Sequence, residues 1–353
     1  MKKFAAAFYA ARIATGLAAT AAAYLLLPKK ESAKPRKVVV ITGGSRGLGL
    51  ALAERYARAG AYLVLAARDE DELASARQTL LDRRALRHED DILLVSADLT
   101  DSDQAAGLIQ SALGAFGKID ILINNAGIIE VGPIEDQPLD AFYRAMDVNF
   151  FAALHTTHAA LPYLLSRPRN TPDASIVNIA SIGGKFAMPH MLPYVASKFA
   201  LTGFSEGLHA ELRHKGIRVT TVCPGLMRTG GEAHAKFTGQ VAREKAWFNV
   251  AAKTPILAAS AKRAADRIFH AVAAGRAEIT ITPQAWLAAR FNGLHPETTQ
   301  FAAALVNHWI LPAPAGSEIS PPTETKGAPW QSDRSTTDSS IPFPEDVQVA
   351  QPS

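Results

Sequence analysis

A tyrosine and a lysine four positions apart, Tyr194 and Lys198, are the side chains in this sequence best suited to acid–base chemistry. Both lie in a pattern that predicts a helix over residues 194–212, so they would share one helix face. A phenol ionises near pH ~10, and a nearby cation favours the phenolate and lowers its pKa. The pair therefore predicts a group that exchanges a proton near neutral pH. Tyr-x-x-x-Lys is common by chance, so the pair has meaning only if other elements build a site around it.

A glycine-rich turn between a strand and a helix supplies the first of these elements. The apolar, β-branched residues 38–41 predict a strand buried on both faces. The sequence TGGSRGLG at 42–49 follows directly, and a helical pattern continues to about Gly60. In that context the glycines let the backbone approach a pyrophosphate, and the helix N-terminus presents free N–H groups to the anion. A tight turn without a ligand is the alternative.

The end of the second predicted strand, residues 61–67, indicates which dinucleotide would bind. An acidic residue at this point accepts from the 2′-OH of NAD, whereas an arginine accommodates the 2′-phosphate of NADP. Arg68 follows the strand, and Arg46 of the glycine turn can converge on the same phosphate. Two cations at this point favour NADP(H) over NAD(H), although Asp69 comes next in the chain.

Further apolar runs alternate with helical patterns along the chain. The predicted strands are residues 38–41, 61–67, 92–95, 119–123, 175–180, 218–222 and 278–281, and helical patterns cover residues 139–165, 194–212 and 259–274. Such alternation predicts an α/β fold with a doubly wound parallel sheet. Ligands of these sheets bind outside the carboxyl ends of the strands, where Asn124, Ser181 and Pro224 fall.

Composition and charge exclude several classes of function. The chain has 353 residues, 48% of them hydrophobic, and a single cysteine, Cys223, so it cannot form an internal disulfide. Its basic excess is local: residues 1–37 carry eight Lys/Arg and one Glu, and residues 312–353 carry two Lys/Arg and six Asp/Glu. The middle of the chain is close to neutral and predicts no nucleic-acid surface. No His/Cys/Asp pattern has metal-ligand spacing.

The N-terminal residues 1–35 form an apolar leader. Residues 13–27 are uninterrupted by charge but shorter than the ~20 residues of a typical membrane span. A secretory signal and an organelle presequence compete with the interpretation favoured here, membrane association through residues 4–27. The basic cluster at residues 29–37 would then keep the catalytic domain on the cytoplasmic side.

The motifs occur together in one order: Thr42-Gly43-x-x-x-Gly47-x-Gly49, Asn124-Asn125-Ala126-Gly127, Asn149, Ser181, Tyr194-x-x-x-Lys198 and Pro224-Gly225. In this order the chain resembles the short-chain dehydrogenase/reductase family, in its compact branch with a Gly-x-x-x-Gly-x-Gly turn. The resemblance covers about residues 36–285 and implies a Rossmann-type fold of three layers, α/β/α. We also expect a homo-oligomer.

The family's catalytic roles carry over to four residues. Tyr194 would be the catalytic acid/base, and Lys198 would lower its pKa and hold the ribose hydroxyls of the nicotinamide half. Ser181 would hydrogen-bond the substrate oxygen, and Asn149 would hold a water that links Lys198 to solvent. One small departure is Ala180, where the family frequently has a second serine.

The resemblance also implies a set of cofactor contacts. Asp98 would contact the adenine, Asn125 to Gly127 the central part of the cofactor, and Pro224, Gly225 and Thr229 its nicotinamide end. The predicted cofactor-binding residues are Gly43, Ser45, Arg46, Gly47, Leu48, Gly49, Arg68, Asp98, Leu99, Asn125, Ala126, Gly127, Tyr194, Lys198, Pro224, Gly225 and Thr229.

Residues 228–258 are expected to cover the substrate. Phe237, Trp247 and Phe248 predict either an apolar pocket or a helix face packed on the core. His190 is predicted to be a pocket-wall or surface residue rather than a catalyst.

Residues 286–311 predict a helical extension beyond the catalytic domain at 36–285. Phe301, Leu305 and Trp309 form an apolar stripe, for which docking on the protein's own core is preferred over membrane contact. The tail at 312–353 has the composition of a disordered segment.

The function predicted from these residues is interconversion of a carbonyl compound and an alcohol by hydride transfer with NADP(H), and membrane contact would suit a lipophilic substrate. A non-catalytic NADP-binding regulator of the same fold is the alternative, but it would not need all of Asn149, Ser181, Tyr194 and Lys198. A nucleotide-sugar epimerase or dehydratase shares Tyr-x-x-x-Lys, but its glycine turn has a different spacing and it carries a larger substrate domain.

Overall fold

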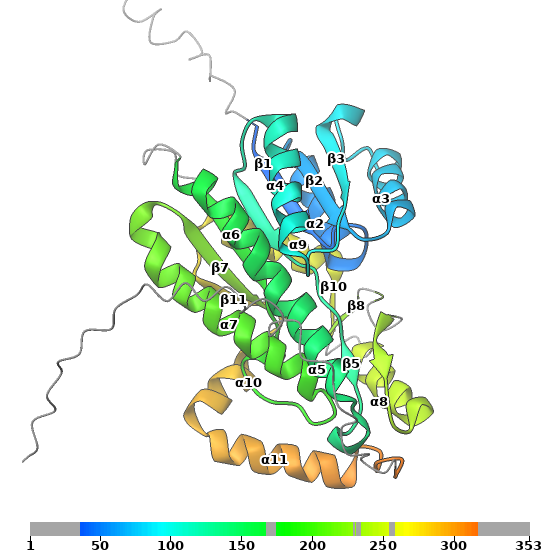
Figure 1. Cartoon of the computed structure of the whole chain (residues 1–353). Helices are drawn as coiled ribbons and strands as arrows, with labels where there is room; N and C mark the ends of the chain where they lie inside the picture. Colours follow the sequence, from blue (N-terminus) through cyan, green and yellow to red (C-terminus); the bar gives the residue numbers. More distant parts are fainter. Residues whose placement is uncertain (1–35, 167–173, 229, 231–233, 254–257, 317–353) are drawn as a thin grey trace, which may run out of the picture.

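The computed structural model describes residues 36–166, 174–228, 230, 234–253 and 258–316 (Figure 1). The predicted N-terminal leader, Thr229 and most of the predicted C-terminal tail lie outside the described residues. No helix in these ranges is both long and apolar enough to cross a membrane.

Seven parallel strands form the central sheet, in the spatial order β11-β7-β6-β4-β1-β2-β3. Their bounds are Val38–Thr42 (β1), Tyr62–Ala67 (β2), Ile92–Ser96 (β3), Ile121–Asn124 (β4), Ser175–Ile179 (β6), Arg218–Cys223 (β7) and Glu278–Thr280 (β11). The chain moves from β3 at one edge across to β4, so the connections reverse direction between β1 and β4. That reversal is the switch point at which doubly wound sheets bind their ligands, and the predicted fold class is confirmed.

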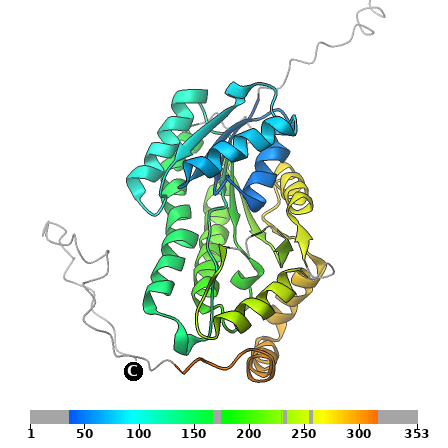
Figure 2. The ribbon, with the colours of Figure 1, turned by 90° about the vertical axis from the view of Figure 1, so that its right-hand side faces the viewer.

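Helices cover both faces of this sheet, as Figure 2 shows. One layer consists of α2 (Gly47–Arg58), α3 (Glu70–Asp82) and α9 (Ala261–Ala273), and the other of α4 (Ser102–Phe116), α5 (Leu139–Met146), α6 (Ala152–Leu165) and α7 (Leu192–Leu212). Two hydrophobic clusters fill the spaces between the sheet and each layer. The β-branched strand residues alternate between them: Val39 and Ile41 belong to one cluster, Val38 and Val40 to the other. The strands are apolar throughout because both faces are buried.

A π-helical segment, Asp147–Phe151, interrupts the helix predicted over residues 139–165. It joins α5 to α6 and carries Asn149, which is completely buried. Single π turns within helices occur frequently at functional sites because they turn a side chain inward. The hydrophobic periodicity of the sequence contains no sign of this turn.

A buried polar network ties the two central strands β4 and β6 to the helices above them. The amide of Asn124 donates to Asn178 Oδ1 at 2.8 Å and to Thr157 Oγ1 at 2.9 Å, and Asn178 Nδ2 donates to Ser205 Oγ at 3.0 Å. Thr156 Oγ1 donates to Asn124 Oδ1 at 2.7 Å. Unsatisfied amides would be costly in this interior, so the network fixes how α6 and α7 sit over the ends of the strands.

Smaller elements surround the carboxyl edge of the sheet. Two short parallel pairs, β5 (Glu130–Val131) with β9 (Lys236–Phe237) and β8 (Met227–Arg228) with β10 (Ala259–Ser260), flank helix α8 (Val241–Lys253). The short 3₁₀ turns are Glu89–Asp91, Ile134–Asp136, Ile182–Gly184 and Arg213–Lys215.

Two helices follow the last strand, α10 (Pro283–Leu294) and α11 (Pro296–Trp309). Helix α10 crosses the predicted domain boundary at residue 285. The preferred prediction for the stripe on α11 is wrong: Phe301, Leu305 and Trp309 are 66%, 44% and 76% exposed. Helix α11 lies at the outer edge of the molecule (Figure 1). The three stripe residues do have helical spacing, but their side chains do not pack on the core.

Candidate active site

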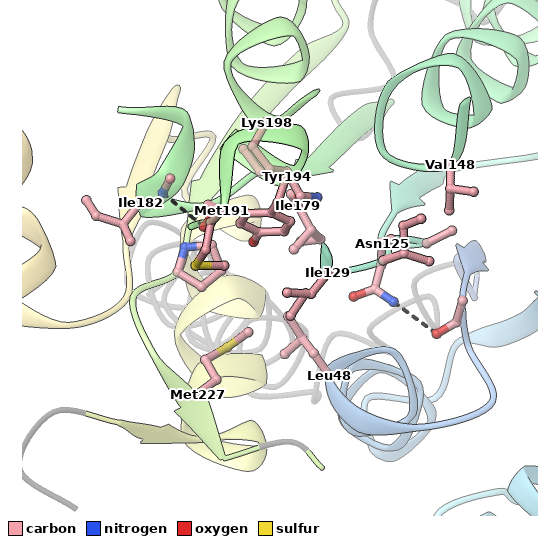
Figure 3. Close-up of a pocket in the computed structure, with 18 of the residues that line it drawn as sticks. Leu48, Asn125, Ile129, Val148, Ile179, Ile182, Met191, Tyr194, Lys198 and Met227 are labelled. Atoms are coloured by element: carbon pink, nitrogen blue, oxygen red, sulfur yellow. Dashed lines mark hydrogen bonds between the residues drawn. The ribbon is translucent and has the colours of Figure 1, made fainter. Parts of the chain in front are cut away.

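A cavity of about 950 Å³ opens at the carboxyl ends of the strands. Its walls come from the turn after β1, the ends of β2, β3, β4, β6 and β7, and the first turns of α7 and α10. Figure 3 shows Tyr194 of α7 and Met191, the residue before α7, projecting toward the space bordered by Ile129 and Met227. This is the expected ligand position for the fold.

The glycine turn is built so that backbone, without side chains, faces this cavity. Gly43 has a left-handed φ of 61°, and a Cβ there would lie 2.9 Å from the Ala126 Cα. A Cβ on Gly49 would lie 2.0 Å from the Gly43 carbonyl oxygen. Asn125 holds the turn from the next strand, since its Nδ2 donates to the carbonyls of Thr42 at 3.0 Å and Gly43 at 2.9 Å. Such a cradle fits a pyrophosphate, which needs close backbone approach.

All but three of the predicted cofactor-binding residues line the cavity. Thr229 lies outside the described residues. Gly47 and Gly49 are not among the residues that line it, so their predicted contacts with the cofactor stay predictions. Gly49 lies beneath Gly43, and Gly47 starts α2 with a φ of 58°, so both glycines shape the turn.

Charged groups gather at the end of the cavity near β2. Arg46 and Arg68 are exposed and line it. Glu72, which the sequence analysis did not single out, forms an ion pair with Arg46 and accepts from Ser45 Oγ at 2.9 Å. Asp69 caps α3 by accepting from the Glu72 N–H at 2.9 Å. Glu72 lies three residues after this N-cap, a position from which a glutamate side chain commonly reaches back past the start of the helix. That spacing was the signal for Glu72 in the sequence.

Ser181, Tyr194 and Lys198 meet at the opposite end of the cavity. Gly183 marks the approach of Ser181 and Tyr194, since a Cβ there would lie 3.2 Å from Tyr194 Cε1 and 3.5 Å from Ser181 Oγ. Ser181 Oγ accepts from the Gly183 N–H at 3.0 Å. Its hydroxyl proton is therefore available to donate toward Tyr194 or a ligand oxygen.

Lys198 is buried and anchored to the end of β6. Its Nζ donates to the Ile179 carbonyl at 2.9 Å. Burial lowers the pKa of Lys198 to about 8, and the nearby Cys223 thiol has a smaller opposite effect. The Nζ lies 5.8 Å from the centre of the Tyr194 ring.

The pKa of Tyr194 moves in the direction opposite to the prediction. Burial raises it above its ordinary value, and a hydrogen bond with Ser181 opposes that rise. Desolvation disfavours a phenolate, and Lys198 directs its ammonium to a carbonyl of β6 instead. The phenol is therefore held protonated at neutral pH.

Asn149 lies behind these residues rather than on the cavity wall. Its Oδ1 accepts from the Ile128 N–H at 2.8 Å, and its Nδ2 donates to the Ile128 carbonyl at 3.1 Å and Ser197 Oγ at 2.8 Å. A Cβ on Gly127 would lie 2.9 Å from Asn149 Oδ1 and 3.5 Å from Lys198 Nζ. The structure thus places Asn149 Oδ1 and Lys198 Nζ near the same point, the position that a side chain on Gly127 would occupy.

A second glycine, Gly184, was also missed by the sequence analysis. A Cβ there would lie 2.5 Å from the Lys198 carbonyl oxygen and 2.4 Å from Thr202 Oγ1. Only glycine lets α7 approach the end of β6 this closely. Two glycines two and three positions after the strand-end serine were the available signal.

The part of the cavity beyond Tyr194 is apolar. Met188, Met191, Trp247 and Phe248 line it, and Phe248 is 5% exposed. Phe237 packs edge-on against Phe248, with ring centroids 5.8 Å apart. Both interpretations of the aromatic residues therefore hold: two of them line the pocket, and the third packs behind it. Among the described residues, no cluster of His, Cys, Asp and Glu is placed to hold a metal ion.

Comparison with known proteins agrees with this geometry. The sequence profile described as short chain dehydrogenase matches residues 37–237. The chain belongs to the short-chain dehydrogenase/reductase family. A relative from Dictyostelium discoideum, "dehydrogenase/reductase SDR family protein 7-like", is 31% identical over 281 residues, which cover 78% of this chain and 83% of that protein.

Other similar proteins match over less of their length or are solved structures. An Anopheles gambiae protein with the same description is 41% identical over 58% of this chain, and the match spans only 65% of that protein. A short-chain dehydrogenase/reductase from Burkholderia phymatum, solved in complex with NAD, is 30% identical with a TM-score of 0.67 and covers 74% of this chain and 95% of its own. The fold thus binds a nicotinamide cofactor in a relative.

The lowered pKa of Lys198 predicts a pH-dependent stability. Between about pH 8 and 10.5 the unfolded chain holds a proton at this lysine that the folded protein has lost. The free energy of unfolding should therefore rise with pH through this window. Below the window, the folded protein carries the full free-energy cost of burying the ammonium. The stability of Lys198→Met relative to wild type should fall by up to about 3 kcal/mol as pH rises through the window.

Urea unfolding at several pH values measures this difference. Lys215→Met, at an exposed lysine, is the matched control and should show no such trend. A pH-independent difference for Lys198→Met would contradict the assignment.

Proposed function

We propose that this protein is an NADP(H)-dependent oxidoreductase that interconverts a carbonyl compound and an alcohol by hydride transfer, with Tyr194 as general acid/base. The observation that carries the proposal is the meeting of Ser181, Tyr194 and Lys198 in the same cavity as the glycine cradle. A proton donor and a dinucleotide cradle in one cavity are what carbonyl reduction requires.

The protein's own residues supply positioning and proton transfer. The glycine turn and the end of β2 would hold NADPH, which would supply the hydride, and the substrate oxygen would gain negative charge. Ser181 Oγ and the Tyr194 hydroxyl donate to that oxygen, and Tyr194 then transfers its proton to it. The raised pKa of Tyr194 keeps the phenol protonated, the form that donates a proton in the direction of reduction. Lys198 and Asn149 both face the space beside Gly127, and a water held there by Asn149 would link Lys198 to solvent and replace the proton.

Preference for NADP(H) rests on the two exposed arginines at the end of β2. Arg46 and Arg68 both line the cavity there, and guanidinium groups suit a phosphate. Glu72 is paired with Arg46, so a 2′-phosphate would compete with this carboxylate for the same guanidinium. Cofactor choice is the outcome of that competition, with Arg68 adding a second cation.

The substrate class follows from the other end of the cavity. Apart from Lys198, the charged residues on its walls lie at the β2 and β3 ends, among the part of the chain that the structure describes. The walls near Tyr194 carry thioethers, aliphatic groups and aromatic rings. A neutral, apolar carbonyl compound fits such walls, whereas a charged metabolite would lose its hydration without a partner.

Membrane association is the third part of the proposal, and the outer face of α10 and α11 supports it. Large apolar side chains at least 40% exposed gather there: Trp286, Leu287, Phe291, Leu294, Phe301, Leu305, Val306, Trp309 and Ile310. Arg290 and Glu297 are the only Lys, Arg, Asp or Glu residues of the two helices. Tryptophans with aliphatic neighbours are typical of surfaces that lie at a bilayer interface.

This apolar face adjoins the substrate cavity, since Ala285 and Ala288 of the same helix α10 line the cavity wall. An apolar substrate dissolved in lipid would reach Tyr194 without crossing much water. Residues 4–27 would provide a second attachment. The basic residues at 29–37 support a catalytic domain on the cytoplasmic side of the membrane.

Replacing the phenol tests the catalytic assignment. Tyr194→Phe should lower carbonyl reduction by at least about a hundredfold, because the substrate oxygen loses its proton donor, while NADPH affinity stays within about twofold. Steady-state kinetics and fluorescence titration with NADPH measure both, and Tyr143→Phe, at an exposed tyrosine, is the control. Near wild-type turnover by Tyr194→Phe would refute the mechanism.

Reversing the charge at the end of β2 tests cofactor choice. Arg68→Asp should shift the kcat/KM ratio toward NAD by about tenfold or more, because it removes one phosphate contact and adds a repulsive carboxylate. Glu72→Gln frees Arg46 and should shift the ratio toward NADP. Arg77→Asp, exposed on α3, should leave it unchanged. An unaltered ratio in Arg68→Asp would count against the 2′-phosphate site.

Flotation of the full-length protein with phosphatidylcholine–phosphatidylserine vesicles tests the membrane surface. Leu294→Glu and Trp309→Glu, at side chains that are each 76% exposed, should together lower vesicle partitioning by at least about tenfold. Gln110→Glu on the distant helix α4 is the control. Unchanged flotation combined with loss of a dimer in sedimentation would show that a second copy of the chain covers this face instead.

A further inference from the structure

A buried carboxylate outside the catalytic group, Glu244, is unusually placed for an acidic residue. It lies on α8 and is 0% exposed. Its Oε1 is 2.8 Å from His190 Nδ1, and its Oε2 accepts from Trp247 Nε1 at 2.6 Å. A carboxylate can only accept hydrogen bonds, so the His190 ring donates to Oε1 and the Trp247 indole donates to Oε2.

His190 joins Glu244 to the loop that precedes the catalytic helix. It lies two residues before α7 begins, is 5% exposed, and has a left-handed φ of 62°. Its carbonyl accepts from the Gly132 N–H at 2.7 Å, just after β5. Strand β5 in turn pairs with β9, which leads into α8. The loop, β5 and α8 therefore form one closed set of contacts around the carboxylate.

Trp247 joins Glu244 to the substrate cavity. Its side chain lines the cavity, and its ring lies 5.7 Å from that of Phe248 in an edge-to-face arrangement. An indole can pack on the same apolar surface in several orientations, but its single N–H donor selects one of them. The bond to Glu244 supplies that selection.

The energetic balance indicates a positioning role. An apolar residue would fill the space under α8 without the desolvation cost that a carboxylate carries. Removing one donor from such a group costs more than the hydrogen bond itself is worth, because the carboxylate oxygen that loses its donor stays buried without a partner. The carboxylate thus makes the orientation of Trp247 depend on the position of His190, four residues before Tyr194.

We propose that Glu244 is a positioning residue that sets substrate specificity: it fixes the orientation of Trp247, which forms a wall of the apolar half of the cavity, relative to the loop that leads into α7 and Tyr194. It touches neither the reacting atoms nor the cofactor cradle. This inference rests on the proposed carbonyl reduction, and it adds that bulky apolar substrates, but not small ones, depend on Glu244.

Kinetics with one bulky and one small carbonyl compound test this dependence. For Glu244→Ala we expect KM for phenanthrenequinone to rise about tenfold or more, with kcat and NADPH affinity within about twofold, and KM for diacetyl nearly unchanged. Glu244→Gln keeps an oxygen for the indole and an N–H₂ for the other imidazole tautomer, so it should remain close to wild type. Equal losses with both substrates, or a wild-type KM for phenanthrenequinone in Glu244→Ala, would overturn the proposal.

His190→Asn provides a second route if Glu244→Ala does not fold, because asparagine tolerates the left-handed backbone. It should raise KM for phenanthrenequinone in the same direction. Where both single variants fold, the double variant should add little, since both changes break one set of contacts. A normal KM in His190→Asn, or fully additive effects, would also overturn it.

Near-ultraviolet circular dichroism gives a readout that does not depend on activity. The band of an immobilised indole, assigned by subtracting the spectrum of Trp247→Phe, should be lost in Glu244→Ala and retained in Glu244→Gln. An unchanged band in Glu244→Ala would show that Glu244 does not hold the ring. If the wild type reduced no carbonyl compound, the proposed function would fail, and this band would still decide whether Glu244 positions Trp247.

Discussion

The close approach of α7 to the end of β6 is the contact on which the rest of the site depends. Gly184 allows it, because any Cβ there would meet the Lys198 carbonyl oxygen at 2.5 Å. At this distance Lys198 can donate to the Ile179 carbonyl, and Tyr194, one turn earlier, comes to lie over Gly183 beside Ser181. Serine, tyrosine and lysine come from two elements, and a single packing distance sets their geometry.

The same contact determines the acid–base properties of the site. Packing α7 on the sheet buries Lys198 and encloses Tyr194, and burial disfavours the charged form of each. The pKa of Lys198 falls to about 8, and that of Tyr194 rises. Both shifts have the same origin, so the site combines a protonated phenol with a lysine that titrates closer to neutrality than an exposed one.

The two ends of the cavity differ in polarity and therefore suit different parts of a ligand. At the β2 end, backbone groups of the glycine turn and paired charges around Arg46 and Glu72 suit a phosphorylated ligand. At the other end, Met188, Met191 and Trp247 provide apolar walls. The carboxylate of Glu244 stands behind the second wall rather than in it, where it orients the indole without adding polarity to the surface that a substrate would contact.

The sequence by itself determined the fold and most of the site. Apolar strand runs can be buried only in a sheet covered on both faces, and the order of motifs places Ser181, Asn125 and Tyr194 at its carboxyl edge, as observed. Only the tertiary structure decided what depends on distances between elements: the inward turn of Asn149, the direction of the Tyr194 pKa, and the pairing of Glu72 with Arg46. The tertiary structure also decided that His190 and Glu244, 54 positions apart, form a buried hydrogen bond. Local periodicity encodes which face of an element is apolar, but not which polar groups meet once the faces are packed.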